Sequence, residues 1–307
     1  MCFGCSKSIS GGIVNFFVKR ASLGARFVIF VRKVVNNHKT GIDKLGILRY
    51  NKENAIGEVE QVPRFFVTND QIENGLLTIR SDDAHHISRA LRMAVGEHIT
   101  ACDCAFEYEC ELTEFLPDCV KAKIIDTKAQ ETEPPCKLTL YQALPKGDKL
   151  DSVIQKSVEC GVCRIVPFES ERCIVRAKPE AESKKRERRE RIAHEAAKQC
   201  GRGVLPTVEA TVDFDDVLSM AKSADLVLFC FEGEGTEPLS RILAKAQPVL
   251  GQEIALVVGS EGGFSLREAA RAKEAGFVMT GLGKRILRTE TAPVFALACI
   301  AGALELQ

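Results

Sequence analysis

Residues 253–301 read EIALVVGSEGGFSLREAARAKEAGFVMTGLGKRILRTETAPVFALACIA and decide the fold. The apolar run Ile254–Val258 predicts a buried strand of a parallel sheet. The strand leads directly into the glycine-rich loop Gly259–Gly263. Behind this loop, Ser265 and Glu268 have the spacing of a capping box, which predicts the start of a helix. The stretch therefore predicts a strand, a tight loop and a helix in succession.

A second glycine loop, Gly281–Gly283, follows the predicted helix and leads into RILRTET at 285–291. Each loop alone is a weak indication, because sharp turns between strands and helices often contain glycine. Together the two loops flank one short helix, with an arginine and a carboxylate close behind. Such an arrangement can hold a small ligand by its edges and place charge beside it.

The alternation of strands and helices extends back to Lys137. We expect strands at 137–143, 163–167, 225–231 and 253–258, and helices at 149–160, 180–199, 237–246, 265–275 and 290–303. This pattern predicts an α/β fold with a mainly parallel sheet covered on both faces. Ligands of such sheets bind at the carboxyl ends of the strands, where the first glycine loop lies.

The preceding part of the chain has a different pattern. We expect short strands at 64–67, 76–80, 97–104, 106–113 and 119–126, with a helix at 82–92. Turn-forming residues separate these runs, so they predict a small β-rich domain. The sequence TEPP at 132–135 is a good linker to the α/β part.

The glycine loops and the residues behind them resemble the SPOUT class of RNA methyltransferases. Within that class they resemble the RsmE family, which methylates N3 of a uridine in small-subunit ribosomal RNA. The family's G-P-E-G-G occurs as GSEGG, with Ser260 in place of proline, and its L-G-x-R-I-L-R-x-E-T-A as LGKRILRTETA. Four upstream blocks follow the family order: RFFV at 64–67, HHISRALRMAVGEHI at 85–99, ALPKGDKLDSVIQKSVECGV at 143–162 and EAAKQCGRGVLP at 195–206.

The resemblance covers the chain from about residue 63 and implies its organisation. Residues 63–132 would form a PUA-like β-barrel that binds RNA. Residues 137–307 would form the SPOUT methyltransferase domain, with a C-terminal trefoil knot. The implied cofactor is S-adenosyl-L-methionine (SAM), and the implied partner is small-subunit (16S) ribosomal RNA, free or in an assembled 30S-type particle. A homodimer with the apolar helix near 292–304 in or beside its interface is implied as well.

The resemblance places the cofactor between the two glycine loops. Glycine lets the backbone approach a ligand closely, and the apolar side chains behind it would form the pocket. The predicted cofactor-binding residues are Gly259, Glu261, Gly262, Gly263, Leu282, Gly283, Ile286, Leu287 and Arg288.

Methylation of a uridine N3 also requires loss of the N3 proton and stabilisation of charge on the flanking carbonyl oxygens. Arg288 is the candidate for stabilising these oxygens or orienting the base. Glu290 is the candidate for removing the proton. The alternative for Glu290 is a residue at a helix N-terminus, where the helix macrodipole favours a carboxylate.

Basic and polar residues in the family blocks are candidates for RNA contacts. They are Arg64, Arg89, Arg92, Lys146, Lys149, Arg172, Gln199 and Arg202. Each could equally form a structural ion pair. The basic run at 184–191 has two interpretations, a solvated helix face with Glu–Arg pairs or a stripe that contacts phosphates.

Residues 1–62 lie outside the resemblance and hold ten Lys and Arg against four Asp and Glu. Three interpretations remain open: translation from an upstream start codon, an organelle transit peptide, or a disordered RNA-binding arm. The rest of the chain holds 32 basic against 38 acidic residues, so any RNA site must be a local patch. We expect a cytoplasmic protein, with organelle import through the extension left open.

Neither a metal site nor a membrane span is expected. The pairs Cys160–Cys163 and Cys102–Cys104 are interpreted as core thiols, because no second Cys or His pair has matching spacing. His85 and His86 are adjacent on a predicted helix and point apart. The apolar C-terminal run of about 13 residues suits a buried helix and is too short for a bilayer.

Two other functions compete with uridine-N3 methylation. The chain could be a non-catalytic RNA-binding or ribosome-assembly factor with a retained cofactor pocket, or a SPOUT methyltransferase for another RNA site. A doubly wound enzyme that uses a nucleotide is less favoured, because the chain has no complete G-x-G-x-x-G and no G-x-x-x-x-G-K-[ST].

Overall fold

The computed structural model describes residues 6–9, 12–15, 62–247 and 250–305. The chain divides into two units, residues 1–60 and 61–307. In the first unit the structure describes one antiparallel hairpin, β1 (Ser6–Ile9) with β2 (Gly12–Asn15). The other expectations for residues 1–62 lie outside the described residues.

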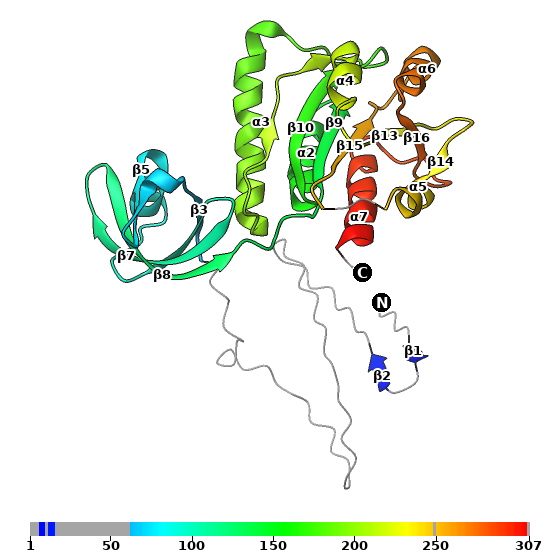
Figure 1. Cartoon of the computed structure of the whole chain (residues 1–307). Helices are drawn as coiled ribbons and strands as arrows, with labels where there is room; N and C mark the ends of the chain where they lie inside the picture. Colours follow the sequence, from blue (N-terminus) through cyan, green and yellow to red (C-terminus); the bar gives the residue numbers. More distant parts are fainter. Residues whose placement is uncertain (1–5, 10–11, 16–61, 248–249, 306–307) are drawn as a thin grey trace, which may run out of the picture. The chain divides into compact units, whose positions relative to one another are not determined.

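The second unit begins with a curved six-stranded sheet (Figure 1). Its strands are β3 (Arg64–Phe66), β4 (Ile72–Glu73), β5 (Leu76–Arg80), β6 (His98–Cys102), β7 (Phe106–Phe115) and β8 (Cys119–Ala129). The order is β3-β6-β7-β8-β5-β4, and only β3 and β6 pair in parallel. Alternate residues point inward, so Leu77, Ile79 and Leu112 are fully buried in its core.

The predicted helix at 82–92 is present but irregular. A short α1 (Ser81–His85) continues as one π-helical turn, His86–Ala90, and the chain leaves it through Arg92 with φ +55°. Ala84 and Ile87 face the core of the six-stranded sheet.

An eight-stranded, all-parallel sheet forms the second part of the unit. Its strands are β9 (Lys137–Ala143), β10 (Val162–Glu169), β11 (Thr207–Val208), β12 (Val212–Asp213), β13 (Leu226–Cys230), β14 (Glu237–Pro238), β15 (Glu253–Val258) and β16 (Val278–Gly281). The order is β11-β10-β9-β15-β13-β16-β14, with β12 beside β10. The central β15 is apolar and buried along almost its whole length, as expected for a strand covered on both faces.

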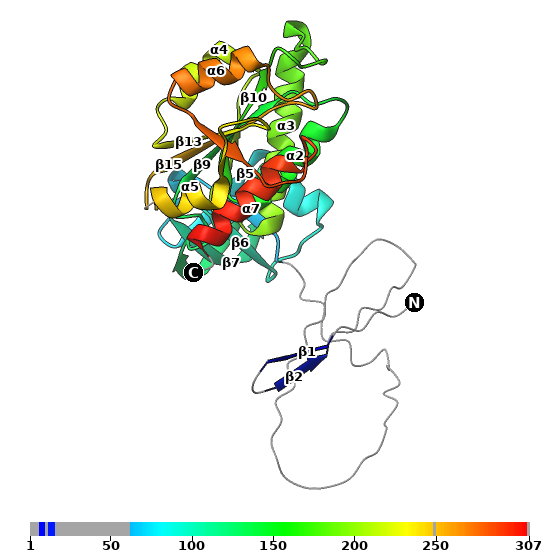
Figure 2. The ribbon, with the colours of Figure 1, turned by 90° about the vertical axis from the view of Figure 1, so that its right-hand side faces the viewer.

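Six helices cover this sheet. They are α2 (Lys149–Glu159), α3 (Pro179–Cys200), α4 (Phe214–Ala221), α5 (Leu239–Ala246), α6 (Leu266–Glu274) and α7 (Ala292–Leu304). Figure 2 shows β9, β13 and β15 between α4 and α6 above and α5 and α7 below. The predicted α/β fold is thus confirmed.

Helix α6 shows how local sequence sets an element. Ser265 and Glu268 form the predicted capping box, with the serine hydroxyl accepting from Glu268 N at 3.1 Å and Ser265 N donating to the carboxylate at 2.8 Å. Gly276 follows the helix with φ +89°, the left-handed conformation in which helices often end. The helix therefore begins and ends where its sequence predicts.

Five elements of the α/β part were not predicted: β11, β12, β14, α4 and β16. Four are strands of two to four residues, too short to show periodicity. Helix α7 was predicted to be buried on nearly all sides. In the single chain it buries Ala296, Leu297 and Ile300, whereas Phe295 and Cys299 are exposed. Among the described residues no helix is both long and apolar enough to cross a membrane.

Candidate functional site

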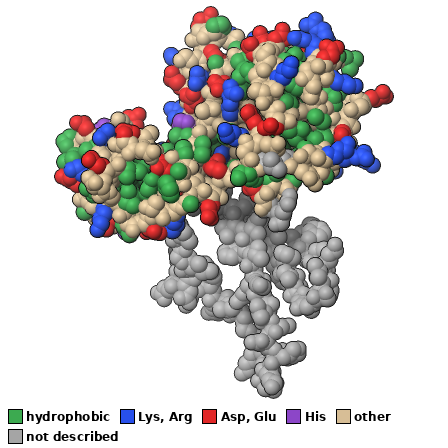
Figure 3. Space-filling view, in the orientation of Figure 1, with side chains coloured by type: hydrophobic (Ala, Val, Ile, Leu, Met, Phe, Trp, Pro, Cys, Tyr) green, Lys and Arg blue, Asp and Glu red, His purple; other side chains and the backbone are tan. Residues whose placement is uncertain are grey.

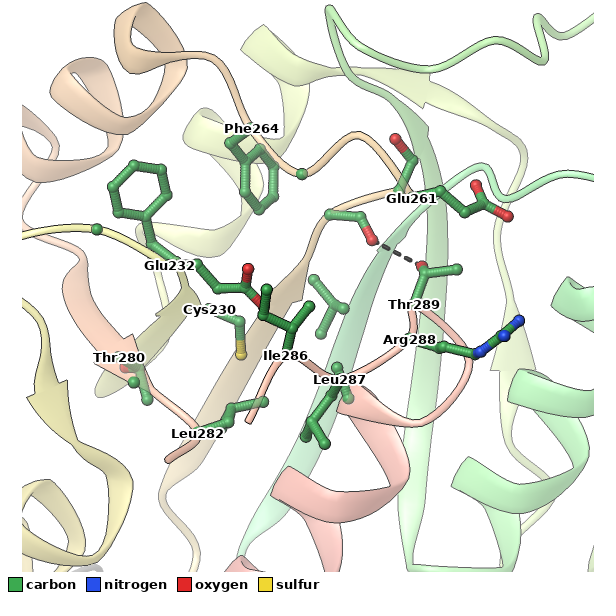
Figure 4. Close-up of a pocket in the computed structure, with 18 of the residues that line it drawn as sticks. Cys230, Glu232, Glu261, Phe264, Thr280, Leu282, Ile286, Leu287, Arg288 and Thr289 are labelled. Atoms are coloured by element: carbon green, nitrogen blue, oxygen red, sulfur yellow. Dashed lines mark hydrogen bonds between the residues drawn. The ribbon is translucent and has the colours of Figure 1, made fainter. Parts of the chain in front are cut away.

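A cavity of about 810 Å³ lies at the carboxyl ends of β13, β15 and β16. Three loops line it: 230–236, 258–264 and 280–289. Figure 4 shows Cys230 and Leu282 on one side of the hollow and Glu261 and Arg288 on the other. All nine residues predicted to bind the cofactor line this cavity.

The loop after β15 is a tight turn. Gly263 N donates to Ser260 O at 2.9 Å, and Gly263 has φ +63°. A Cβ on Gly259 would lie 3.1 Å from the Cα of Gly263, so the turn itself requires glycine there. A Cβ on Gly262 would lie 3.0 Å from the Cβ of Arg172. The prediction explained Gly262 by close approach of a cofactor, but the structure fills this space with Arg172.

A buried hydrogen-bond network joins the two glycine loops. The hydroxyl of Thr289 donates to Gly259 O at 2.7 Å, and Gln142 Nε2 donates to the same hydroxyl at 3.1 Å (Figure 4 draws the threonine bond). Gln142 is the sixth residue of β9 and is fully buried. Sequence reasoning missed both residues. A lone glutamine in a buried apolar strand was the available signal, because buried polar groups need partners.

The two candidate catalytic residues flank Thr289 and differ in environment. Arg288 is exposed and lines the cavity. Glu290 is half-buried and does not line it, and its Oε2 lies 3.3 Å from the ammonium nitrogen of Lys149. The predicted helix at 290–303 begins only at Ala292, so Glu290 precedes it.

Lys149 also contacts the first glycine loop. Its ammonium nitrogen lies 2.8 Å from Oε1 of Glu261, and the backbone N–H of Lys146 donates to the same carboxylate at 3.2 Å. Partial burial raises the pKa of Glu261, but the hydrogen bonds from Lys149 and from backbone N–H groups outweigh it and hold the pKa below its ordinary value. The bond to Glu261 in turn raises the pKa of Lys149.

The loop 230–236 is a third wall of the cavity that sequence reasoning did not assign. Its sequence is CFEGEGT, and a Cβ on Gly233 would lie 2.3 Å from the ring of Phe231. The signal was present, because a glycine-rich segment follows a predicted strand of the same sheet. Burial raises the pKa of the Cys230 thiol to about 12, so this thiol is protonated at neutral pH.

Apart from Lys149, the structure separates the candidates for RNA contact into two groups. Exposed side chains form one group: Arg89, Arg92, Lys146, Arg172 and Gln199. Arg202 is buried, pairs with Glu133 and donates to Val162 O and to Val158 O. Arg64 pairs with Glu107 and is largely covered. For Arg64 and Arg202 the structure therefore favours the structural ion pair over the RNA contact.

Helix α3 carries the basic run, and the structure supports its interpretation as a paired face in part. Arg186 pairs with Glu190 at 3.0 Å, and Arg189 is buried against Glu182 at 2.8 Å. Figure 3 shows acidic and basic side chains interspersed over one face of the α/β part. No large field of a single sign covers the described residues visible in that view.

The prediction that Cys102, Cys104, Cys160 and Cys163 are core thiols is confirmed in part. Cys102 is buried, and Cys160 and Cys163 are half-buried at the end of α2 and in β10. Cys104 is exposed and follows β6 with φ +77°, so its assignment to the core was wrong: the chain has already left the strand. In the described part of the chain no group of three or more His, Cys, Asp or Glu is arranged to hold a metal ion.

Comparisons with known proteins agree with this geometry. Residues 132–301 match the RNA methyltransferase domain family. The ribosomal RNA small subunit methyltransferase E of Bacillus subtilis is 36% identical over 250 residues, which is 79% of this chain and 97% of that protein. The protein of the same name from Synechocystis is 33% identical over 79% of this chain and 78% of that protein.

Solved structures give the same assignment. The small subunit methyltransferase E of Neisseria gonorrhoeae, solved with bound SAM, matches with a TM-score of 0.67 and 31% identity over 78% of this chain and 97% of that chain. A Legionella pneumophila protein solved with bound SAM matches with a TM-score of 0.68 and 30% identity over 79% of this chain and 98% of that chain. The chain therefore belongs to the RsmE family of ribosomal RNA small subunit methyltransferases.

Proposed function

We propose that this protein transfers a methyl group from SAM to N3 of a uridine in small-subunit ribosomal RNA. One observation carries the proposal: the two glycine loops form a single cavity, joined by Thr289, in a chain whose relatives bind SAM. Cavities that bind ligands of this size usually have volumes of about 300–1,000 Å³. The volume of about 810 Å³ fits that range.

The lining suits the different parts of SAM. Leu282, Leu287 and Phe264 supply apolar surface, and the backbone of the loop 259–263 lines the cavity beside them, where it can meet a heteroaromatic edge. We assign all nine lining residues predicted from the sequence to cofactor binding. When bound, SAM supplies an electrophilic methyl group.

Two residues of the chain would serve the reaction. Arg288 is exposed at the cavity wall, where its guanidinium can donate to a uracil carbonyl oxygen as negative charge develops there. Glu290 lies two residues further on, outside the cavity lining, and would accept the N3 proton through a water molecule. The ammonium nitrogen of Lys149 lies 3.3 Å from this carboxylate.

RNA would reach the cavity along its exposed basic rim. Lys146 and Arg172 flank the loop after β15, since Lys146 N donates to Glu261 and Arg172 donates to Gly262 O at 3.1 Å. Arg89 and Arg92 are exposed on the six-stranded part and would hold a more distant segment. Gln199 remains a candidate at the end of α3.

The finer fold assignments are part of the proposal. The chain after β16 passes the ends of β13 and β15 before Thr289 meets Gln142 on β9, and we interpret this path as a trefoil knot. We interpret the six-stranded sheet of residues 63–132 as a PUA-like domain and 137–307 as the SPOUT domain. The exposed face of α7, which includes Phe295, would pair two copies in a homodimer. An enzyme for ribosomal RNA is expected in the cytoplasm, where subunits are assembled.

The test is methyl transfer to small-subunit particles from cells that lack this enzyme, with mass mapping of the modified nucleoside. We expect a single N3-methyluridine. Methylation of another nucleotide would overturn the specificity. SAM binding without transfer to RNA or particles would instead favour the non-catalytic assembly factor.

A further inference from the structure

Lys149 lies where three segments of the site meet. It is the first residue of α2, and its ammonium nitrogen contacts Glu261 at 2.8 Å and Glu290 at 3.3 Å. Glu261 belongs to the loop after β15, and Glu290 belongs to the segment before α7. One cation therefore joins both glycine-loop segments to the segment that follows β9.

Lys149 differs from a lysine in a simple surface ion pair, because its single positive charge lies beside two negative charges. One carboxylate oxygen of Glu261 and one of Glu290 lie within 3.3 Å of the same ammonium nitrogen. They are consequently no more than about 6 Å apart, a range in which like charges oppose each other. Without the ammonium group, two carboxylates on neighbouring loops would face each other and push the loops apart.

The same contacts distinguish Lys149 from a simple phosphate contact. Two carboxylates already occupy its ammonium group. Lys146, three residues earlier, has an exposed side chain with no ion pair among the described residues, and it is the better phosphate contact of the two. The prediction of an RNA contact at Lys149 thus gives way to a role inside the site.

We propose that Lys149 is a positioning residue for methyl transfer, whose ammonium group holds the Glu261 loop and the Glu290 segment in one relative geometry. On the buried side, the hydroxyl of Thr289 links the two segments through its hydrogen bond to Gly259 O. On the solvent side, Lys149 links them through its ion pairs with Glu261 and Glu290. The inference rests on the proposed function, because this geometry matters only for a cavity that binds SAM.

Calorimetric titration of the RNA-free protein with SAM tests the proposal. Lys149→Met removes two partly exposed ion pairs, so we expect SAM to bind about fivefold more weakly. Lys149→Arg keeps a cation that can bridge both carboxylates and should restore affinity to within about twofold of the wild type. Lys156→Met is the matched control, because Lys156 is an ion-paired lysine on the same helix, with Glu159 as its partner at 2.8 Å.

A double variant separates positioning from packing. Lys149→Met/Glu290→Gln removes the repulsion between the carboxylates and should bind SAM more tightly than Lys149→Met alone, because Glu290 does not line the cavity. The same coupling should appear in a double-mutant cycle on thermal unfolding without SAM. Additive effects in both measurements would overturn the proposal. So would normal SAM affinity of Lys149→Met combined with weaker RNA binding. Failure of the proposed function gives a different result, because the wild-type protein would then show no SAM binding in the titration.

Discussion

Gly262 gives a direct test of the loop geometry. A Cβ atom there would lie 3.0 Å from the Cβ of Arg172 and 3.2 Å from its carbonyl oxygen. Carbon atoms in contact prefer separations of about 3.5–4.0 Å, so Gly262→Ala must move the two loops apart by about half an ångström. Rotation of the arginine side chain does not relieve this clash, because both atoms belong to its backbone or are attached directly to it.

The expected cost follows from that displacement. Inserting a methyl group into a packed site typically costs about 1–3 kcal/mol. If the cost falls on the loop that lines the cavity, SAM should bind about five- to 150-fold more weakly to Gly262→Ala. Gly262→Val adds two further methyl groups and should abolish measurable binding.

The assay is titration calorimetry with SAM, with thermal unfolding to establish that each variant is folded. Gly302→Ala is a control, because its Cβ would meet no atom within 4 Å and the residue lies in α7. The double variant Gly262→Ala/Arg172→Gly removes the Cβ–Cβ contact and should recover part of the affinity. A Gly262→Ala variant that binds SAM within about threefold of the wild type would refute the reasoning, since the predicted loss is larger.

Four further outcomes are expected. Arg288→Ala should lower kcat about 100-fold and SAM affinity much less, as single-turnover assays and calorimetry can show. Glu290→Gln should lower the rate at neutral pH and recover as pH rises, because hydroxide can then remove the N3 proton; a wild-type pH–rate profile would exclude Glu290 as the base. Arg202→Ala should lower the free energy of unfolding by about 3 kcal/mol, since Glu133 loses its partner; unchanged thermal stability would reject this. The logarithm of the affinity for an RNA fragment should fall with the logarithm of the salt concentration with a slope of about −3, because four of the seven predicted cations have no ion pair with the described residues; a slope near −5 would require all seven.

Local signals account for the parts of the fold that could be predicted. Strands β9 and β15 have the predicted bounds, 137–143 and 253–258, because turn residues bound both of them and β15 is a continuous apolar run after Glu253. Helix α6 follows its capping box. The nine cavity residues were found because each glycine loop is a contiguous motif, and these motifs carry the family resemblance that places the cofactor between them.

Contacts between distant residues account for what was missed. Thr289 and Gln142 are separated by 147 positions, and no sequence motif contains both residues. The loop 230–236 faces the same cavity only because β13 lies between β15 and β16, an order that sequence periodicity does not reveal. Sheet order therefore decides which loops meet, and it depends on the path of the whole chain.

The partners of the basic residues could not be predicted from the sequence either, and these partners affect RNA binding. Arg202 and Lys149 both lie in blocks shared with the family, and sequence alone offers phosphate as a partner for each. In the structure Glu133 accepts from Arg202, whereas Glu261 and Glu290 surround Lys149. Carboxylates from remote segments thus withdraw these cations from the RNA surface. On a mildly acidic body whose cations are partly held by carboxylates, phosphate attraction alone gives weak binding, and the choice of one uridine must depend on contacts at the cavity itself.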